Sequence, residues 1–275
     1  MKNSRLPISV VLLTRNEERN VSECLQSCDF AEEIVVVDDD STDQTVAIAE
    51  SMGAKVFHRS LNGDWGAQKT FGIQKATCPW IVLIDADERV TPTLRASIRD
   101  VVTGVKPKRA YLIQRENHFT SADVKHGCLR PDWVLRLLPR EGAHSVGKVH
   151  EAVVTPFDEE RLEGRLKHFP YASWDSYYRK IELYSRLSAD KYLSEGKHCN
   201  FVSDILLRSL WAFFKVYVIN RGFMDGKLGF IFSMNHYFYT MSKYVRYYYL
   251  KNYGGKICQA TARLRTKRGI FEPPE

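Results

Sequence analysis

Short apolar runs alternate with helix-like segments through the first hundred residues, and this alternation restricts the fold more than any other feature of the chain. Buried strands are predicted at residues 8–13, 34–37, 55–58 and 80–84. Helices are predicted at residues 18–28, 41–52, 65–76 and 91–102. Strands and helices that alternate in this way form a parallel sheet with helices on both faces. The sequence therefore predicts an α/β fold.

Local signals mark where two of these helices begin and end. Ser41 or Thr42 is predicted to cap the second helix, and Gly53 is predicted to end it. Thr91 and Pro92 predict a cap followed by proline at the first helical position of the fourth helix. These signals agree with the limits that the apolar spacing indicates.

The alternation ends near residue 104, and the rest of the chain differs in pattern and in charge. Strands are predicted at residues 110–115 and 133–138, in an irregular mixed-sheet region that extends to about residue 157, and helices from Ser173 onwards. Residues 1–160 carry 20 basic and 24 acidic side chains, whereas residues 161–275 carry 20 basic and 9 acidic ones. We therefore expect two regions, 1–160 and 161–275, and an anionic surface as a partner of the second.

Acidic residues gather where the predicted strands end. Glu17 follows the first strand, aspartates 38–40 follow the second, and Asp85 and Asp87 follow the fourth. Ligands of open α/β sheets bind at the carboxyl ends of the strands. Converging carboxylates repel one another unless a cation or a ligand rich in hydrogen-bond donors neutralises them, and Mg²⁺ prefers such oxygens. Helix capping is the alternative, which we favour for Asp43; for Asp85 with Asp87 we favour a ligand site.

No standard nucleotide-binding loop follows the first strand. The segment TRNEERN, residues 14–20, stands where a dinucleotide fold has G-x-G-x-x-G, and the sequence contains no P-loop. A nucleotide is still accommodated if carboxylates hold its base and ribose while a metal and a cationic side chain hold its diphosphate.

Four segments resemble, in order and spacing, the donor-side motifs of the family 2 glycosyltransferases. They are ISVVLLTRNEERN, IVVVDDDSTDQT, GAQKTFGIQKA and WIVLIDADERV, between residues 8 and 90. The resemblance implies the GT-A fold, a mostly parallel mixed sheet between helices, with a helical C-terminal extension. It also implies a UDP-sugar donor and a divalent metal cofactor, Mg²⁺ or Mn²⁺. Within residues 1–160, we expect a donor half at 1–103 and an acceptor half at 104–160.

The same resemblance implies a role for individual residues. The base and ribose are expected beside Leu13, Arg15, Glu17 and Asp39, the diphosphate beside Lys69, the ribose also beside Asp85, and the metal on Asp87. Ala86 is expected among the substrate-binding residues. Arg15 stands where many members of the family have an aromatic residue. In the second strand-end motif, Asp38 and Asp40 are expected to position the turn that presents Asp39.

Motifs of the second half are similar to the bacterial lipopolysaccharide inner-core β-1,4-glucosyltransferases. They are WVLRLLPR at 133–140, GKVHEAV at 147–153 and GFMDGKLGF at 222–230. This resemblance implies transfer of glucose from UDP-glucose to a lipopolysaccharide-type glycolipid. Glu151 is then expected to be the base that removes the acceptor proton, alongside Asp87 as the catalytic metal ligand, with a structural ion pair to Lys148 as the alternative. For His150 we favour an orienting or packing role over a metal contact.

The second region allows three interpretations. Residues 205–219 have 12 apolar positions of 15, interrupted by two cations and a serine, which is too broken for a membrane span. Six tyrosines between residues 237 and 249 are interleaved with Lys243, Arg246 and Lys251. Aromatic rings beside cations suit an anionic membrane surface, which we favour over helices packed as core. No nucleic-acid-binding motif is present, so we expect no nucleic acid as a partner.

These observations predict a cytoplasmic enzyme that is peripheral on the inner face of a bacterial inner membrane. The cysteines form no CxxC pair, and the N-terminal apolar run is too short for a signal peptide. The leading hypothesis is an inverting, metal-dependent glycosyltransferase with a lipid-linked acceptor. A transferase of the same fold with a polyisoprenyl-phosphate, cell-wall or capsule acceptor, and a catalytically silent sugar-nucleotide-binding protein, are the alternatives.

Overall fold

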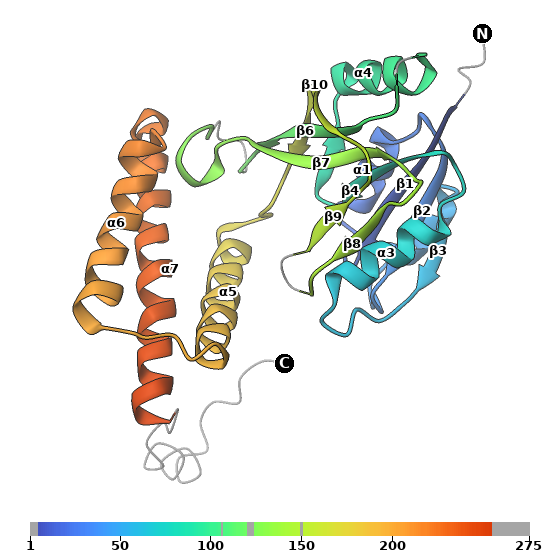
Figure 1. The fold of residues 1–275 in the computed structure, drawn as a ribbon. Helices are drawn as coiled ribbons and strands as arrows, with labels where there is room; N and C mark the ends of the chain where they lie inside the picture. Colours follow the sequence, from blue (N-terminus) through green and yellow to red (C-terminus); the bar gives the residue numbers. More distant parts are fainter. Residues whose placement is uncertain (1–4, 106, 120–123, 149–150, 255–275) are drawn as a thin grey trace. The chain divides into compact units, whose positions relative to one another are not determined.

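The chain forms two compact units. A computed structural model describes residues 5–105, 107–119, 124–148 and 151–254 (Figure 1). The first unit comprises Met1–Lys125 and Leu129–Pro170, and the second comprises His126–Cys128 and Tyr171–Glu275. The boundary that we expected at residue 160 falls inside a strand of the first unit, so the structure moves it to residue 170.

The first unit is built on an eight-stranded mixed sheet in the order β3-β2-β1-β4-β7-β6-β10-β5. The strands are β1 (Leu6–Thr14), β2 (Ala31–Asp38), β3 (Lys55–His58), β4 (Trp80–Asp85), β5 (Glu88–Val90), β6 (Ala110–Asn117), β7 (Asp132–Pro139) and β10 (Glu159–His168). The pairs β3–β2, β2–β1, β1–β4 and β6–β10 are parallel. Because β7 is antiparallel to both β4 and β6, the strands β1, β2, β4, β6 and β10 all end at the same edge.

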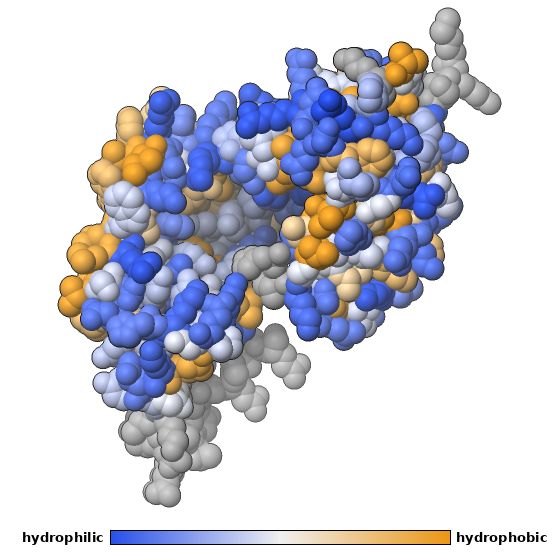
Figure 2. Space-filling model, in the orientation of Figure 1, coloured by the Kyte–Doolittle hydropathy of each residue, from blue (hydrophilic) through white to orange (hydrophobic). Residues whose placement is uncertain are grey.

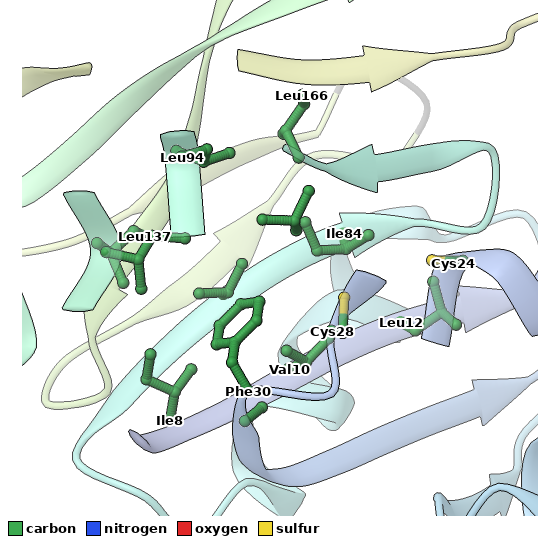
Figure 3. Close-up of a cluster of buried hydrophobic side chains, with 14 of the residues drawn as sticks. Ile8, Val10, Leu12, Cys24, Cys28, Phe30, Ile84, Leu94, Leu137 and Leu166 are labelled. Atoms are coloured by element: carbon green, nitrogen blue, oxygen red, sulfur yellow. The ribbon is translucent and has the colours of Figure 1, made fainter. Parts of the chain in front are cut away.

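Helices cover both faces of this sheet, as the alternating pattern predicts. They are α1 (Val21–Ser27), α2 (Thr45–Ser51), α3 (Trp65–Lys75) and α4 (Pro92–Thr103). One face buries a large cluster to which α1, α2 and α4 contribute, with Ile8, Val10, Leu12 and Ile84 from the central strands (Figure 3). On the other face, α3 packs on the sheet, beside a separate antiparallel ribbon of β8 (His144–Val146) and β9 (Ala152–Val154). The predicted α/β class is confirmed.

The cap of α4 is as predicted, but that of α2 is not. The Thr91 hydroxyl accepts a hydrogen bond from the Leu94 N–H at 3.3 Å, with Pro92 at the first helical position. The helix α2 begins only at Thr45, because the Ser41 N–H and hydroxyl both donate to Asp38. The competing carboxylate therefore holds the chain in a turn for three further residues.

Strand β10 was not predicted. Its buried side chains, Leu162 and Leu166, are four residues apart, a spacing that also fits one face of a helix. A register shift in its pairing with β6 falls between Leu162 and Arg165, where Gly164 has a φ of 98°. A Cβ on Gly164 would lie 2.5 Å from the Leu94 Cα of α4, so only glycine allows this approach. Tertiary pairing, rather than local pattern, makes this segment a strand.

The second unit is helical. Its elements are η1 (Gly127–Leu129), which begins in it, α5 (Trp174–Ser194), η2 (Phe201–Leu207), α6 (Arg208–Phe214), η3 (Lys215–Ile219), η4 (Gly222–Asp225) and α7 (Gly226–Tyr253). The Ser173 hydroxyl accepts from the Ser176 N–H and so caps α5, where helices were predicted to begin. No helix in the described part of the chain is long and apolar enough to cross a membrane.

A buried carboxylate fixes the amino-terminal edge of the sheet. Glu33 on β2 accepts hydrogen bonds from the Lys55 ammonium on β3 and the Thr77 N–H before β4, both at 2.7 Å, and from the Ser9 hydroxyl on β1. Its side chain is only 4% exposed. Burial alone would raise the pKa of Glu33, but the bonds from Lys55, Ser9 and Thr77 outweigh it and lower that pKa to about 2.

We predict that Glu33→Gln destabilises the first unit by roughly 1–3 kcal/mol at pH 7, because one amide oxygen cannot replace the charged acceptor of three donors. Since the folded-state pKa is depressed, the stabilisation is complete above pH 4.5 and is lost as the pH falls towards 2. Urea denaturation of both proteins between pH 7 and pH 2.5 measures this. A difference that does not shrink at low pH would contradict the assignment.

Candidate active site

The three consecutive aspartates at the end of β2, of which Asp38 is the last residue of the strand, have separate surroundings. Asp38 is fully buried and accepts from the Thr14 hydroxyl at 2.9 Å and from the N–H and hydroxyl of Ser41. Asp40 adopts a left-handed φ of 52° and accepts from the Ser60 hydroxyl. Asp38 and Asp40 therefore shape the turn. Asp39, between them, instead pairs with the exposed side chain of Arg15.

Arg15 and Asp39 form an ion pair across the ends of β1 and β2. The Arg15 guanidinium lies 2.7 Å from one oxygen of Asp39, and the Leu61 N–H donates to the other at 2.7 Å. The Arg15 side chain is 63% exposed, whereas that of Asp39 is 10% exposed. The exposed guanidinium of Arg15 thus lies against the nearly buried carboxylate of Asp39. Together they present hydrogen-bond donors and acceptors to a polar ring or a ribose.

Two further expected nucleotide-binding residues lie at the same edge. Leu13 is partly buried and pairs in register with Val37 on one side and Asp85 on the other. Glu17 accepts from the Asn20 side-chain amide at 2.8 Å, at the entrance to α1. The structure therefore brings Leu13 beside Asp85, and places Arg15 and Glu17 in the segment that directly follows the strand carrying Leu13.

Arg136 is buried between two carboxylates at the end of β4. Its guanidinium on β7 lies 2.5 Å from Asp85 and 2.6 Å from Glu88, and Glu88 is fully buried. Arg115 adds a second cation 3.6 Å from Glu88. Burial acts to raise the pKa of Asp85, but the charges of Arg136 and Lys69 outweigh it and hold that pKa well below its usual range. Asp85 therefore remains a carboxylate at neutral pH.

A tight turn brings Asp87 to the end of β10. Strand β5 pairs with β10, opposing Glu88 to His168, and Asp87 Oδ2 lies 3.3 Å from His168 Nε2. His168 Nδ1 lies 2.6 Å from Asn117 Oδ1, and the Asn117 amide nitrogen donates to the carbonyls of Leu129 and Arg130. Because this fixes the Asn117 oxygen as an acceptor, His168 Nδ1 carries a proton and donates it to Asn117, while Nε2 faces Asp87.

This donor set fits a divalent cation that also binds phosphate. A carboxylate oxygen and an imidazole nitrogen 3.3 Å apart place two lone pairs face to face, which is unfavourable without a proton or a cation between them. No group of three or more His, Cys, Asp or Glu side chains in the described residues is arranged to hold a metal. Mg²⁺ typically takes one or two protein carboxylates and completes its shell with water and substrate phosphate, which matches so small a protein contribution.

Lys69 and Glu151, expected to have different functions, form an ion pair. Lys69 on α3 lies 2.8 Å from Glu151, which precedes β9. Backbone hydrogen bonds hold α3 to this ribbon, because the N–H groups of Trp65 and Gly66 donate to the carbonyls of Lys148 and Gly147. The partner of Glu151 is therefore Lys69, and not Lys148 as in the alternative structural interpretation.

Ala86 and His150, which the sequence also singled out, are not among the paired side chains of the site. The Ala86 side chain is buried in the core below the site, and its carbonyl accepts from Arg89 at 2.8 Å. His150 lies outside the described residues. Sequence reasoning missed His168 and Arg136. A histidine directly at a strand end is a usable signal for the first, but β10 itself was not predicted, and nothing local distinguishes Arg136 from other arginines.

Comparisons with known proteins identify the family of the chain. Residues 9–119 match the family model of Glycosyl transferase family 2. The chain is 31% identical over 245 residues to an uncharacterized glycosyltransferase of Rickettsia bellii, covering 82% of this chain and 81% of that one. It is 29% identical over 257 residues to the lipopolysaccharide core biosynthesis glycosyltransferase LpsC of Rhizobium meliloti, covering 90% and 95% of the two chains.

A solved structure is similar over part of the chain. The crystal structure of glucosyl-3-phosphoglycerate synthase from Mycobacterium tuberculosis, with Mn²⁺, UDP and phosphoglyceric acid, is 20% identical with a TM-score of 0.36. The match covers 50% of this chain and 56% of that one.

The sheet order, the mixed strand directions and the acidic turn after β4 agree with the GT-A fold expected from the motifs. With the match of its first half to the family model and its similarity over most of its length to glycosyltransferases, the chain belongs to glycosyl transferase family 2.

Proposed function

We propose that the chain is an inverting, metal-dependent hexosyltransferase that moves glucose from UDP-glucose to the inner-core heptose of a lipopolysaccharide-type glycolipid. One observation carries the proposal. Three charged pairs, Arg15–Asp39 and Asp87–His168 at the carboxyl ends of strands and Lys69–Glu151 between α3 and the start of β9, each have the chemistry that one part of such a reaction needs. The similarity to a lipopolysaccharide core glycosyltransferase over most of both chains supports the acceptor class.

The donor binds along the edge from β2 to β4. Arg15, Glu17 and Asp39 hold the base and ribose, and Asp85, kept ionised by Arg136, accepts from a ribose hydroxyl. Asp87 and His168 are the residues that would hold Mg²⁺ or Mn²⁺, and a cation there would supply positive charge for the diphosphate leaving group. Asn117 fixes the His168 tautomer that such a ligand requires.

Glu151 acts as the general base and Lys69 as the cation of the diphosphate. In the structure the two neutralise each other at 2.8 Å. A bound diphosphate offers Lys69 a stronger anionic partner, and the carboxylate that Lys69 leaves is then available to accept the acceptor proton. Donor binding thereby prepares the base before the acceptor reacts.

The acceptor is anchored in a membrane, so we propose that the enzyme works as a peripheral protein on the cytoplasmic face of a bacterial inner membrane. The excess of basic residues in the second region supports an anionic surface as partner. Incubation of the purified chain with UDP-glucose, Mn²⁺ and lipopolysaccharide truncated after its first heptose tests the function. Glucose-dependent mass gain supports it; transfer only to a polyisoprenyl phosphate, or only from another UDP-sugar, would overturn the specific acceptor or donor.

We predict that Asp87→Asn and His168→Gln each weaken Mn²⁺ binding in the presence of UDP by more than about tenfold, because each removes one of two protein ligands. Isothermal titration with Mn²⁺ measures this without any turnover. The matched control is Asp100→Asn, an exposed aspartate on α4, which should bind Mn²⁺ as the unchanged protein does. Unchanged Mn²⁺ affinity in both site variants would remove the pair from the metal site.

We predict that substitutions of the two ion-pair partners affect different steps, transfer for Glu151 and UDP binding for Lys69. Glu151→Gln should lower transfer roughly 10²–10⁴-fold without weakening UDP affinity, because the base is lost while Lys69 is freed for the diphosphate. Lys69→Met should weaken UDP binding. Single-turnover transfer rates and UDP titration separate the two effects, with exposed Glu141→Gln as control. Weaker UDP binding by the Glu151 variant would show that Glu151 is a donor-binding residue instead.

A further inference from the structure

The helical run from Phe201 to Ile219 is apolar on two sides. One side, which includes Ile205, Ala212 and Val216, is buried in the packing with α7. The other side exposes large apolar side chains along the length of the run. They include Leu207, Leu210, Trp211 and Phe214, at 57%, 57%, 56% and 45%. A surface helix of a water-soluble domain normally carries polar residues on the side that α7 leaves open.

The exposed apolar side continues onto the neighbouring elements of the same unit. Aromatic rings of the helical run pack against rings of η4 and α7. The ring centroids of Phe213 and Phe230 are 5.9 Å apart, and those of Tyr217 and Phe223 are 6.3 Å apart. Phe223 and Phe230 are themselves 51% and 46% exposed. We call this surface, between Phe201 and Ile231, the apolar face; Figure 2 shows hydrophobic residues gathered along α6. Exposed apolar surfaces of this extent mark interaction sites.

The charges around the apolar face are positive. Residues 199–254 contain seven Lys and Arg residues and two acids. Both acids have nearly buried side chains, with Asp204 paired to Arg208 and Asp225 to His126. Lys215, Arg221 and Lys227 lie within the apolar face, are exposed, and have no ion-pair partner among the described residues. The surface therefore combines apolar side chains with uncompensated positive charge.

This combination selects one occupant. A second copy of the chain would bring the same cations against these cations, since an isologous contact pairs identical surfaces. An anionic bilayer instead offers an apolar acyl layer beneath a negatively charged headgroup layer. The aromatic and aliphatic side chains would enter the acyl layer, while the longer cationic side chains would reach the headgroups. Because no helix of the described part can span a membrane, such binding leaves the run in the plane of the interface.

We propose that the apolar face inserts into the headgroup region of an anionic bilayer, with Lys215, Arg221 and Lys227 at the level of the lipid phosphates. The inference rests on the proposed function in one respect, that a glycolipid acceptor lies in a bilayer. It moves the membrane contact away from the tyrosine-rich end of α7 that the sequence suggested.

That end of α7 is engaged within the helical unit. Lys243 lies over the rings of Tyr239 and Tyr244, each at 5.3 Å. Arg246 pairs with Glu182 of α5, and Lys251 donates to the Lys197 carbonyl. These cations hold the helices together, so they are poorly placed to bind lipid as well.

Flotation of the full chain with vesicles tests the proposal. Vesicles of phosphatidylcholine with phosphatidylglycerol should recover the protein, with weaker recovery on phosphatidylcholine alone. Combined Leu207→Gln, Leu210→Gln and Phe214→Gln should lower partitioning by at least about tenfold, because three inserted apolar side chains are lost. The matched control, Leu183→Gln with Leu187→Gln and Leu193→Gln on α5, changes three leucines of 42–44% exposure and should alter partitioning less than twofold.

The cations are tested in the same assay. Lys215→Gln with Lys227→Gln should lower recovery on the mixed vesicles more than Lys243→Gln with Lys251→Gln, and the loss should resemble that caused by high salt. Trp211 emission should shift to the blue on binding.

Each contrary result is informative. No recovery on either vesicle, or equal recovery of both triple variants, overturns the proposal. A dimer in sedimentation velocity that the Leu207, Leu210 and Phe214 changes dissociate, without lipid binding, assigns the face to a second copy. UDP-glucose hydrolysis, measured without lipid, should be equal in both triple variants. Its absence from the unchanged chain, with lipid binding as expected, would refute the proposed function and leave this inference standing.

Discussion

Arg136 neutralises a concentration of negative charge that would otherwise oppose folding at the carboxyl end of β4. Asp85 and Glu88 both lie within 2.6 Å of its guanidinium, and Glu88 is shielded from water completely. A buried carboxylate without a partner costs several kcal/mol, so the turn between these two residues depends on an arginine from β7. That turn carries Asp87. The position of the proposed metal ligand thus depends on the pairing of Arg136 with Asp85 and Glu88.

The proposed site consists of charges that are already paired within the protein. Arg15 covers Asp39, Lys69 covers Glu151, and Asp87 faces His168. Such pairs keep the unliganded protein stable. In the proposed function, the charged donor then replaces one partner of each pair, so it does not meet uncompensated carboxylates. The exchange costs little, because every interaction that is broken has a counterpart with the nucleotide, the diphosphate or the cation. In the proposed function, the same exchange would free Glu151 to act as the base only after the donor has bound.

What the sequence predicts well depends on local chemistry. The strands and helices to residue 103, apart from β5 and the start of α2, follow from short-range pattern, as do the cap at Thr91 and the gathering of acids at strand ends. His168 was not predicted as a site residue because its strand was not predicted. Strand β10 forms only through its pairing with β5 and β6, and the two buried leucines of β10 fit a helix equally well. The ion pair of Lys69 with Glu151 joins residues 82 apart in the chain, and no local signal encodes it. The same limit applies to the tyrosines of α7, whose composition suggested lipid but whose neighbours are α5 and its own turns.

The helical unit does not need the bilayer in order to fold. Ile205, Ser209 and Val216 are almost completely buried, and Gly229 approaches the Gly222 carbonyl so closely that any larger residue would displace backbone. One side of the run from Phe201 to Ile219 is therefore fixed by packing, while the opposite side carries apolar residues that are about half exposed and contribute less to that packing. Exposed leucine and phenylalanine of this kind favour aggregation in water. Their presence beside unpaired cations is explained if the preformed surface meets lipid, because insertion then removes apolar area from water without any refolding of the unit.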